Sequence, residues 1–224
     1  MTSDREAEPV ALAFLAKGFH AAVLRYTVSP QGYFPTQLFE TARSVELIRT
    51  HAEEWHCDAE RIVLCGFSAG GHLAASYAAL WNRGFIRNTL GLSAEMLRPN
   101  GAILCYSVIT SGDFAHRYSF DALLGKRRDS AEMLRLVSVE EQVGGDVPPM
   151  FIWHTFSDDT VPVENALKMA HALAAYKIPV ELHIFPKGGH GLSLCDERTT
   201  SCSYGIQSDC AVWMDMASRW LHNL

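Results

Sequence analysis

The stretch Gly66-Phe67-Ser68-Ala69-Gly70 follows the apolar run Arg61-Ile62-Val63-Leu64-Cys65 and precedes Gly71-His72-Leu73-Ala74-Ala75. This order predicts a buried strand, a glycine-framed serine on a sharp turn, and a helix. Gly66 and Gly70 are expected to leave room where a side chain would collide with the neighbouring strand or helix. A serine exposed at the end of a strand is typical of a nucleophile, so the stretch predicts acyl transfer through Ser68.

The chain has 224 residues, a formal net charge of -6, 48% hydrophobic residues and 20% charged residues. This length suits one α/β core, and we expect a single domain over residues 1–224. The negative charge and the scattered basic residues argue against nucleic acid as a partner. No apolar run approaches the roughly 20 residues that span a bilayer. The polar, acidic stretch Met1–Glu6 lacks the pattern of a secretory signal, so we expect a cytoplasmic protein.

The six cysteines indicate reduced thiols rather than a disulfide framework. Cys65 and Cys105 fall in apolar, strand-like runs, where we expect them to act as small buried hydrophobes. Cys195, Cys202 and Cys210 cluster near the C-terminus, and a zinc site there would lack a fourth well-spaced ligand. A disulfide from Cys195 to Cys202 or Cys210 stays open as an alternative. The sequence predicts no metal and no cofactor.

Predicted helices and strands alternate along the chain, which is typical of a mostly parallel sheet with helices on both faces. The predicted strands cover residues 19–26, 61–67, 102–108, 151–154 and 180–185, and the predicted helices cover residues 3–17, 36–55, 70–81, 164–177 and 209–221. Segments 82–101 and 111–147 are less regular. They follow strands, on the side where open α/β sheets bind ligands, so we expect them to shape the substrate site.

Two later segments offer partners for a serine nucleophile, which needs a general base and an orienting carboxylate. Asp158 and Asp159 follow the predicted strand that ends at His154, and either could also be a turn residue. His190 lies between glycines on a loop after the last predicted strand. The order serine, acid, histidine matches that of hydrolases built on a strand–serine–helix turn.

Four stretches together carry a resemblance to a known superfamily: Leu24-Arg25-Tyr26, Arg61 to His72, Pro148 to Pro162 and Phe185 to Leu192. The chain resembles the α/β-hydrolases, and within them the acetylxylan-esterase-like, dienelactone-hydrolase- and prolyl-oligopeptidase-related bacterial esterases. The resemblance implies an α/β-hydrolase fold with Ser68 as nucleophile and His190 as base. The acid of the family pattern aligns with Asp158, and Asp159 is the second choice.

Positions along the chain suggest further supporting residues. The backbone N–H of Ala69, at the start of the helix, is expected to donate to the oxyanion, helped by the helix dipole. Tyr26, Tyr33 and Tyr106 are candidates for lining the substrate pocket, although packing in the core or at the rim is as well supported. We expect structural roles for His154, His171 and His183, and a packing or supporting role for His72 at the start of the helix after Ser68.

One element of the family pattern has no counterpart before Ser68. Such esterases take a second oxyanion donor from a glycine run after an earlier strand, and Ser3–Pro9 resembles the sequence that directly follows that run. We therefore expect an N-terminally truncated core in which the strands at 19–26 and 61–67 close up, or a shortened form of a longer protein. Removing one oxyanion donor costs about a hundred- to a thousandfold in rate, so we expect impaired catalysis.

These observations predict a serine carboxylesterase for short acyl esters. The resemblance implies acetyl groups on a sugar, hence a small-molecule partner, and it leaves a homo-oligomer open. A peptidase or acylaminoacyl hydrolase with the same three residues is one alternative. A remnant without activity, acting as an interaction module, is another, favoured by the absent glycine run and opposed by the retained serine, acid and histidine.

Overall fold

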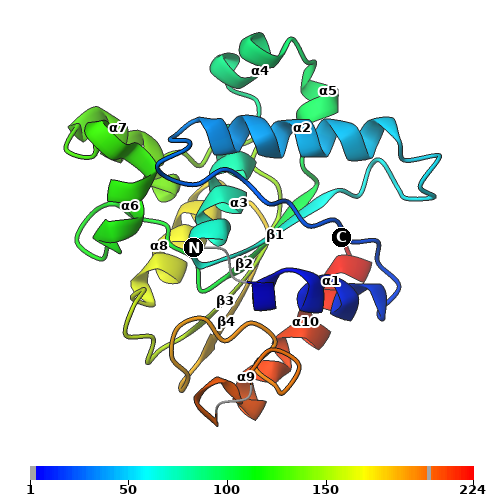
Figure 1. Cartoon of the computed structure of the whole chain (residues 1–224), viewed down its shortest axis with the longest axis vertical. Helices are drawn as coiled ribbons and strands as arrows, with labels where there is room; N and C mark the ends of the chain where they lie inside the picture. The colour runs from blue at the N-terminus through cyan, green and yellow to red at the C-terminus, as the bar shows by residue number, and fades with distance from the viewer. Residues whose placement is uncertain (1–3, 201–202) are drawn as a thin grey trace.

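A four-stranded parallel sheet forms the centre of the computed structural model, which describes residues 4–200 and 203–224 (Figure 1). Its strands run in the order β1-β2-β3-β4, with bounds Val63–Phe67, Gly101–Cys105, Met150–Thr155 and Val180–Phe185. Each neighbouring pair is parallel. The predicted parallel α/β architecture is therefore confirmed.

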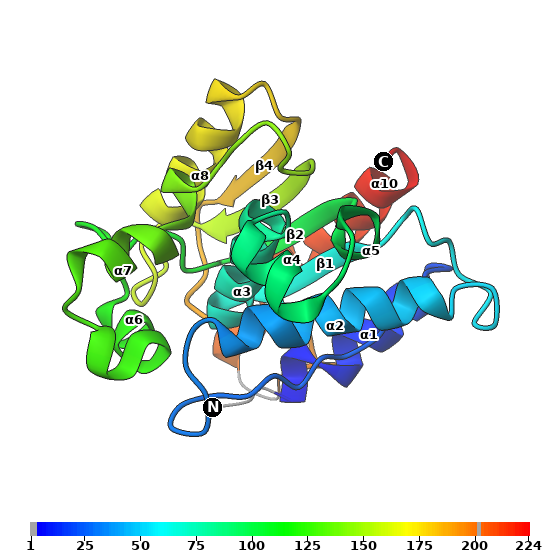
Figure 2. The same ribbon diagram turned by 90° about the horizontal axis from the view of Figure 1, so that it is seen from above.

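Helices cover both faces of this sheet (Figures 1 and 2). Their bounds are α1 Glu8–Leu15, α2 Thr36–Thr50, α3 Ser68–Leu80, α4 Gly84–Leu90, α5 Ala94–Leu97, α6 Arg117–Leu124, α7 Ala131–Val137, α8 Glu164–Ala175, α9 Ser208–Ala211 and α10 Trp213–His222. Apolar residues of α1 and α10 pack on one face of the sheet, and those of α3 and α8 pack on the other. Helix α2 packs outside α3, together with α4 to α6.

The two faces are held by different side chains. On the α10 face, Trp213 stacks on Trp153 with ring centroids 5.4 Å apart, and both rings are fully buried. On the α3 face, Ala75 and Ala78 are fully buried, so the helix approaches the strands closely. Burial of large aromatic rings and close packing of small side chains both stabilise the sheet that carries the site.

The expected strand at residues 19–26 is absent. This segment has no regular structure, and Val23 and Leu24 are 41% and 38% exposed. It runs from α1 to α2 on the β1 side of the sheet (Figures 1 and 2). A strand needs a hydrogen-bonding neighbour. Within the described part of the chain, no ladder pair joins residues 19–26 to β1, so the expected closing-up of the two strands does not occur.

Strand β1 is consequently an edge of the described sheet. The prediction that Cys65 is buried is wrong, because Cys65 lies on this edge and is exposed. Cys105 lies on the next strand and is buried, as predicted. The difference follows from the sheet order, since an inner strand is covered on both edges and an outer strand on only one.

Some predicted helix limits shift. The first helix begins at Glu8 after the 3₁₀ turn Asp4–Glu6, and Ser3, its expected cap, lies outside the described residues. The last helix is divided into α9 and α10. Segments 82–101 and 111–147 contain α4 to α7, together with the 3₁₀ turns Gly125–Arg127 and Val139–Glu141; a further turn covers Ser203–Gly205.

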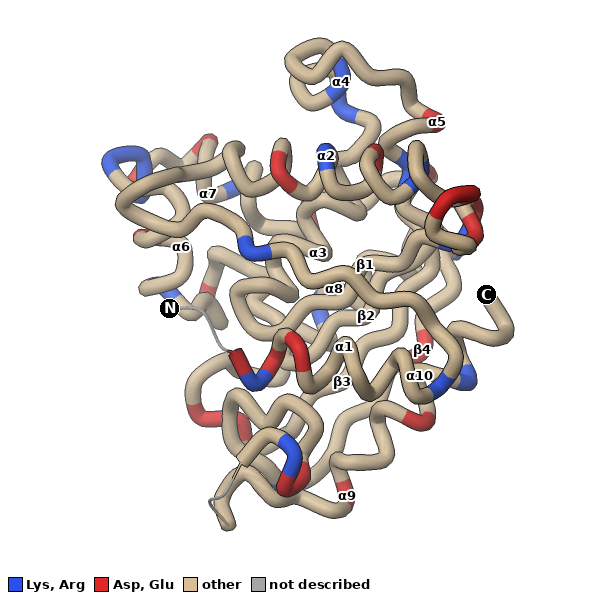
Figure 3. Tube along the Cα trace, turned by 45° about the vertical axis from the view of Figure 1, so that its right-hand side comes forward, with Lys and Arg blue, Asp and Glu red and all other residues tan. Residues whose placement is uncertain are grey.

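Acidic and basic residues are interspersed along the described trace (Figure 3). Asp4, Arg5, Glu6 and Glu8 follow one another closely at its start, beside the segment that leads to α2. Among the described helices, none combines the length and the apolar character needed to cross a membrane.

Candidate active site

Ser68 occupies the turn between β1 and α3 with φ at 51°, a left-handed conformation that is strained for a residue with a side chain. A Cβ on Gly66 would lie 2.2 Å from the carbonyl oxygen of Gly70, so this position requires glycine. The predicted crowding at Gly70 itself is wrong, because its nearest neighbour would be the Tyr26 hydroxyl at 3.7 Å. The second crowded glycine is Gly71, whose Cβ would meet Ser107 Oγ at 1.9 Å.

The structure brings the serine, the histidine and one of the two candidate acids into a single chain of hydrogen bonds. Ser68 Oγ lies 2.7 Å from His190 Nε2. His190 Nδ1 lies 2.8 Å from Asp158 Oδ2. Because a carboxylate can only accept, Nδ1 carries the ring proton and the Nε2 lone pair faces the serine hydroxyl. This geometry can move a proton from Ser68 to His190.

The Asp158 carboxylate is completely buried, and its other oxygen is also satisfied. Asp158 Oδ1 accepts the backbone N–H groups of Thr160 and Val161, each at 2.9 Å. Burial opposes the charged form, but hydrogen bonds from His154, His190 and Val161 outweigh it and lower the pKa of Asp158. Asp159 is exposed and accepts only from Thr160 Oγ1, at 3.3 Å, among the contacts described.

Hydroxyl groups at the end of β3 and just after it hold the loop that carries His190. Gly188 has φ at 138°, which other residues rarely adopt. Its carbonyl oxygen accepts the hydroxyls of Thr155 and Ser157, each at 2.9 Å. A Cβ on Gly189 would meet the Tyr204 hydroxyl at 1.5 Å, so glycine also lets this ring cover the loop. The glycines around His190 therefore have conformational and packing roles.

Tyr106 lies beneath the site rather than lining a pocket. It is 1% exposed, and its ring meets the His190 ring in a T-shaped arrangement with centroids 5.2 Å apart. Its hydroxyl donates to Glu6 Oε1 at 2.7 Å and accepts the backbone N–H of Ser193 at 2.8 Å. Tyr106 thus ties the N-terminal turn to the segment that follows His190. Burial, followed by the charge of Glu6, raises its pKa well above the ordinary value.

The other two candidate tyrosines take different positions. Tyr33 is 37% exposed, and a Cβ on Gly125 would lie 2.5 Å from its ring, so Tyr33 packs on the end of α6. Tyr26 is half-buried and its hydroxyl points toward Gly70 in the first turn of α3. Of the three tyrosines, Tyr26 is the one whose hydroxyl lies beside the Ser68 turn.

Sequence reasoning missed His116. His116 directly precedes α6, and its Nδ1 pairs with Oγ of Ser119, within that helix, at 2.9 Å. Burial and then the His190 ring lower its pKa, while Asp158 opposes this shift. These interactions place His116 near the hydrogen-bonded chain of Ser68, His190 and Asp158. The available signal was a histidine inside the segment 111–147, which was itself predicted to shape the substrate site.

Three of the histidines with expected structural roles make fixed local contacts. His72 Nε2 donates to the carbonyl oxygen of Val137 at 2.8 Å, and burial lowers its pKa. His154 is fully buried and its Nε2 donates to the carbonyl oxygen of Val161 at 2.9 Å. His183 pairs with a glutamate on its own strand. The first contact links α3 to α7, and the second links β3 to the loop that carries Asp158.

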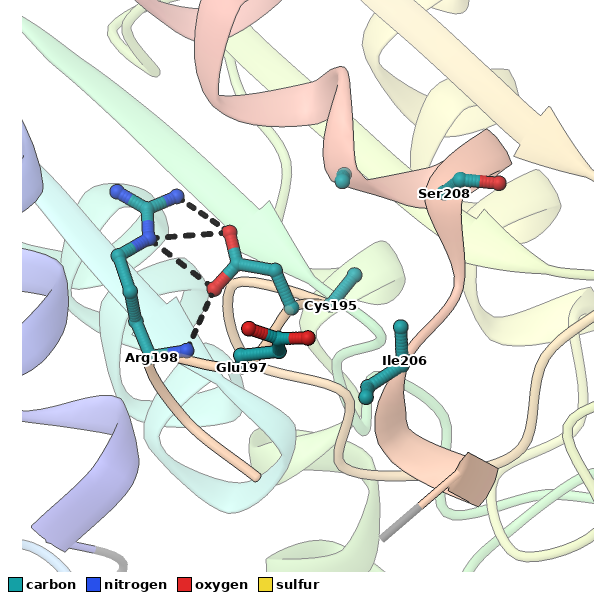
Figure 4. A pocket seen from close by; sticks show the side chains of 7 residues that line it. Cys195, Glu197, Arg198, Ile206 and Ser208 are labelled. Carbon is teal, nitrogen blue, oxygen red and sulfur yellow. Dashed lines mark hydrogen bonds and ion pairs between the residues drawn. The ribbon is translucent and has the colours of Figure 1, made fainter. Parts of the chain in front are cut away.

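A surface pocket of about 450 Å³ lies outside this constellation (Figure 4). It is lined by Cys195, Asp196, Glu197, Arg198, Ile206, Ser208 and Ala211. Cys195 and Cys210 are buried free thiols, so the structure contains no disulfide between them, and Cys202 lies outside the described residues. In residues 4–200 and 203–224, no cluster of three or more histidine, cysteine or acidic side chains is arranged to hold a metal.

Comparisons with known proteins give a family model and several curated relatives that match this chain. The family model BD-FAE matches residues 2–173. Endo-1,4-beta-xylanase B of Butyrivibrio fibrisolvens is 37% identical over 202 residues, covering 88% of this chain and 31% of the relative. The acetylxylan esterase of Xylanibacter ruminicola is 26% identical over 179 residues, covering 78% of this chain and 35% of the relative. The chain thus spans about a third of the length of these curated relatives.

Solved structures extend the likeness to almost the whole chain. The acetyl ester-xyloside bifunctional hydrolase of Caldicellulosiruptor lactoaceticus superposes with a TM-score of 0.84 at 35% identity, covering 98% of this chain and 77% of that one. The carboxylesterase Cest-2923 of Lactobacillus plantarum superposes with a TM-score of 0.87 at 29% identity, covering 99% of this chain and 80% of that one. These similarities agree with the predicted esterase-like α/β-hydrolase fold.

Proposed function

The chain belongs to the BD-FAE family, and from that premise we propose that it is a serine carboxylesterase that works through an acyl-enzyme. The observation that carries the proposal is the continuous chain of hydrogen bonds from Ser68 through His190 to Asp158. Its members come from the ends of β1, β3 and β4, where parallel sheets present their loops to ligands.

The geometry supports a definite sequence of steps. His190 Nε2 takes the Ser68 proton while Ser68 Oγ bonds to the ester carbonyl carbon. Asp158 holds the ring in the required tautomer and stabilises the imidazolium. The proton then passes to the alcohol, which leaves, and water activated by His190 releases the acid and restores Ser68. The charged oxygen of each tetrahedral intermediate needs donors, and the Ala69 N–H at the start of α3 supplies one.

Short acyl groups, acetyl above all, on carbohydrate alcohols are the proposed substrates. This part is supported by what the relatives are named for, namely an acetylxylan esterase and an acetyl ester-xyloside hydrolase. The exposed side chains of Tyr118, within α6, and Phe156, after β3, fit a site open to a large alcohol. A sugar ring stacks on such aromatic faces with its apolar side.

Hydrolysis of acylated amino acids is a second candidate. The acylamino-acid-releasing enzyme of Mus musculus is 27% identical over 154 residues, covering 66% of this chain and 20% of the relative. The same serine, histidine and acid would serve this reaction, but the leaving group is an amine rather than an alcohol. Comparison of an acetyl ester with an acetyl-amino-acid anilide separates the two activities.

A panel of p-nitrophenyl esters, from acetate to longer chains, tests the proposed function. We expect turnover to be highest with acetate and to disappear in Ser68→Ala. Ser208→Ala is the matched control, because Ser208 is exposed in the separate pocket of Figure 4. Turnover that survives Ser68→Ala would show that another group carries the reaction. Hydrolysis of the anilide but not of the esters would favour the second candidate.

A further inference from the structure

The hydroxyl of Tyr26 lies at the end of α3 that carries the proposed oxyanion donor. It is the nearest atom that a Cβ on Gly70 would meet, at 3.7 Å. Gly70 directly follows Ala69, whose N–H is the assigned donor, and both lie in the first turn of α3. The N–H groups of a first helical turn have no partner within the helix and attract negative charge. The Tyr26 hydroxyl therefore lies beside the first helical turn that contains the proposed oxyanion donor.

The backbone on both sides of Tyr26 is anchored. The Arg25 guanidinium pairs with Asp4 at 3.0 Å and with Glu8 at 2.9 Å. On the other side, the N–H and hydroxyl of Thr27 donate to the carboxylate of Glu40. A segment without regular structure is thus held on either side of the tyrosine. Such anchoring preorganises a side chain, and preorganised donors are the effective ones in catalysis.

The Tyr26 hydroxyl has no hydrogen-bond partner among the described residues, whereas those of Tyr77 and Tyr106 do. Tyr26 is half-buried, so the group remains reachable by a ligand. Burial and then the charge of Glu6 raise the pKa of Tyr26, which keeps the phenol protonated and able to donate. The Glu6 carboxylate itself accepts from Tyr106.

We propose that the Tyr26 hydroxyl is the second oxyanion donor of this site, acting with the Ala69 N–H. The assignment rests on the proposed function of Ser68. In the reaction, the ester carbonyl oxygen gains negative charge as Ser68 Oγ attacks, and the phenol donates a hydrogen bond to it without losing its proton.

Tyr26→Phe tests this role, since it removes one oxygen and keeps the ring. We expect kcat to fall about 100-fold, the order found when one oxyanion donor is removed, with little change in KM. Affinity for an aryl trifluoromethyl ketone, which forms a tetrahedral adduct with the serine, should fall by a similar factor. Tyr176→Phe is the matched control, because Tyr176 is exposed at the end of α8. A merely structural role would lower the melting temperature instead.

The outcomes separate the two proposals. If Ser68→Ala abolishes turnover and Tyr26→Phe retains wild-type kcat, the Tyr26 assignment is wrong and the esterase proposal stands. If Ser68→Ala keeps its activity, the esterase proposal itself fails. Should Tyr26→Phe not fold, 3-fluorotyrosine at position 26 gives an independent test, because it keeps the ring and the hydroxyl and makes the phenol a stronger hydrogen-bond donor. We expect a higher kcat in that variant, and an unchanged kcat would contradict the assignment.

Discussion

Ser68 Oγ and His190 Nε2 lie 2.7 Å apart, although 122 positions separate the two residues in the sequence. The contact depends on two conformations that few residues adopt, the left-handed turn at Ser68 and the glycine turn at Gly188. It also depends on Asp158, which holds the opposite side of the imidazole at 2.8 Å. Substitutions of Asp158, of Gly66 beside the Ser68 turn and of Tyr106 beneath the imidazole should therefore have distinct effects on kcat and stability.

Asp158 and Asp159 offer a matched pair of substitutions. Asp158→Asn should lower kcat by about 10⁴-fold, the order for the corresponding change in serine proteases, because an amide favours the wrong histidine tautomer. Asp159→Asn should leave kcat unchanged, since Asp159 is exposed and its described contact is with Thr160 rather than His190. Steady-state hydrolysis of p-nitrophenyl acetate measures both. Equal effects of the two variants would refute the assignment of the acid.

The lowered pKa of Asp158 predicts how stability depends on pH. An unfolded aspartate titrates near 3.9, so the ionised, hydrogen-bonded carboxylate contributes its full stabilisation above about pH 5. That contribution is lost as the pH falls from the unfolded pKa through the folded one. The free energy of unfolding of wild type relative to Asp158→Asn should be constant from pH 7 to about pH 5 and decrease below about pH 4. Urea unfolding at several pH values measures it, and a difference that grows on acidification would contradict the shift.

Tyr106 is expected to matter for stability as well as for activity. Tyr106→Phe leaves the Ser193 N–H and a Glu6 carboxylate oxygen without their partner, which should cost about 1–3 kcal/mol. For a chain of this length that lowers the melting temperature by roughly 2–4 °C per kcal/mol. Tyr176→Phe is the control, because Tyr176 is 55% exposed at the end of α8, away from the proposed site. Identical melting temperatures for the two variants would show that the buried contacts contribute nothing.

Gly66 and Gly145 differ in the space around them. A Cβ on Gly66 would lie 2.2 Å from the backbone oxygen of Gly70, whereas nothing lies within 4 Å of one on Gly145. Gly66→Ala should therefore destabilise the fold by about 1–3 kcal/mol or more and displace the Ser68 turn. Gly145→Ala should be neutral. Chemical denaturation of both variants is the measurement, and a stable, fully active Gly66→Ala would contradict the close approach of β1 to the first turn of α3.

Thiol reactivity tests the exposed edge of the sheet. Cys65 is exposed, whereas Cys105, Cys195 and Cys210 are buried. Iodoacetamide should modify Cys65 in the folded protein and the other three only after unfolding. Peptide mapping by mass spectrometry identifies the labelled positions. Protection of Cys65 equal to that of Cys105 would mean that something covers the edge of β1.

Local patterns were sufficient to predict the Ser68 turn, the sheet type and the residues brought together around His190. In each case the signal lies within a few residues: an apolar strand, a glycine pair or a loop after a strand. The preference for Asp158 over Asp159 came from resemblance alone, because both follow the same strand. Only the fold shows that one carboxylate is buried against His190 and the other is exposed.

The failures concern relations between distant segments. Residues 19–26 have the composition of a strand, but a strand exists only where a neighbour accepts its hydrogen bonds, and β1 does not pair with them. The same missing partner exposes Cys65. Tyr106 was expected at a pocket and lies under His190, since its burial depends on the N-terminal turn and Ser193. The cytoplasmic location, the single-domain organisation and the oligomeric state stay predictions.

Acid-quenched incubation with p-nitrophenyl acetate, followed by peptide mapping, tests the central claim most directly. We predict an acetyl group on the peptide that contains Ser68, absent from Ser68→Ala and strongly reduced in Asp158→Asn. Acetylation of a different serine, or release of p-nitrophenol with wild-type kinetics by Ser68→Ala, would contradict the account.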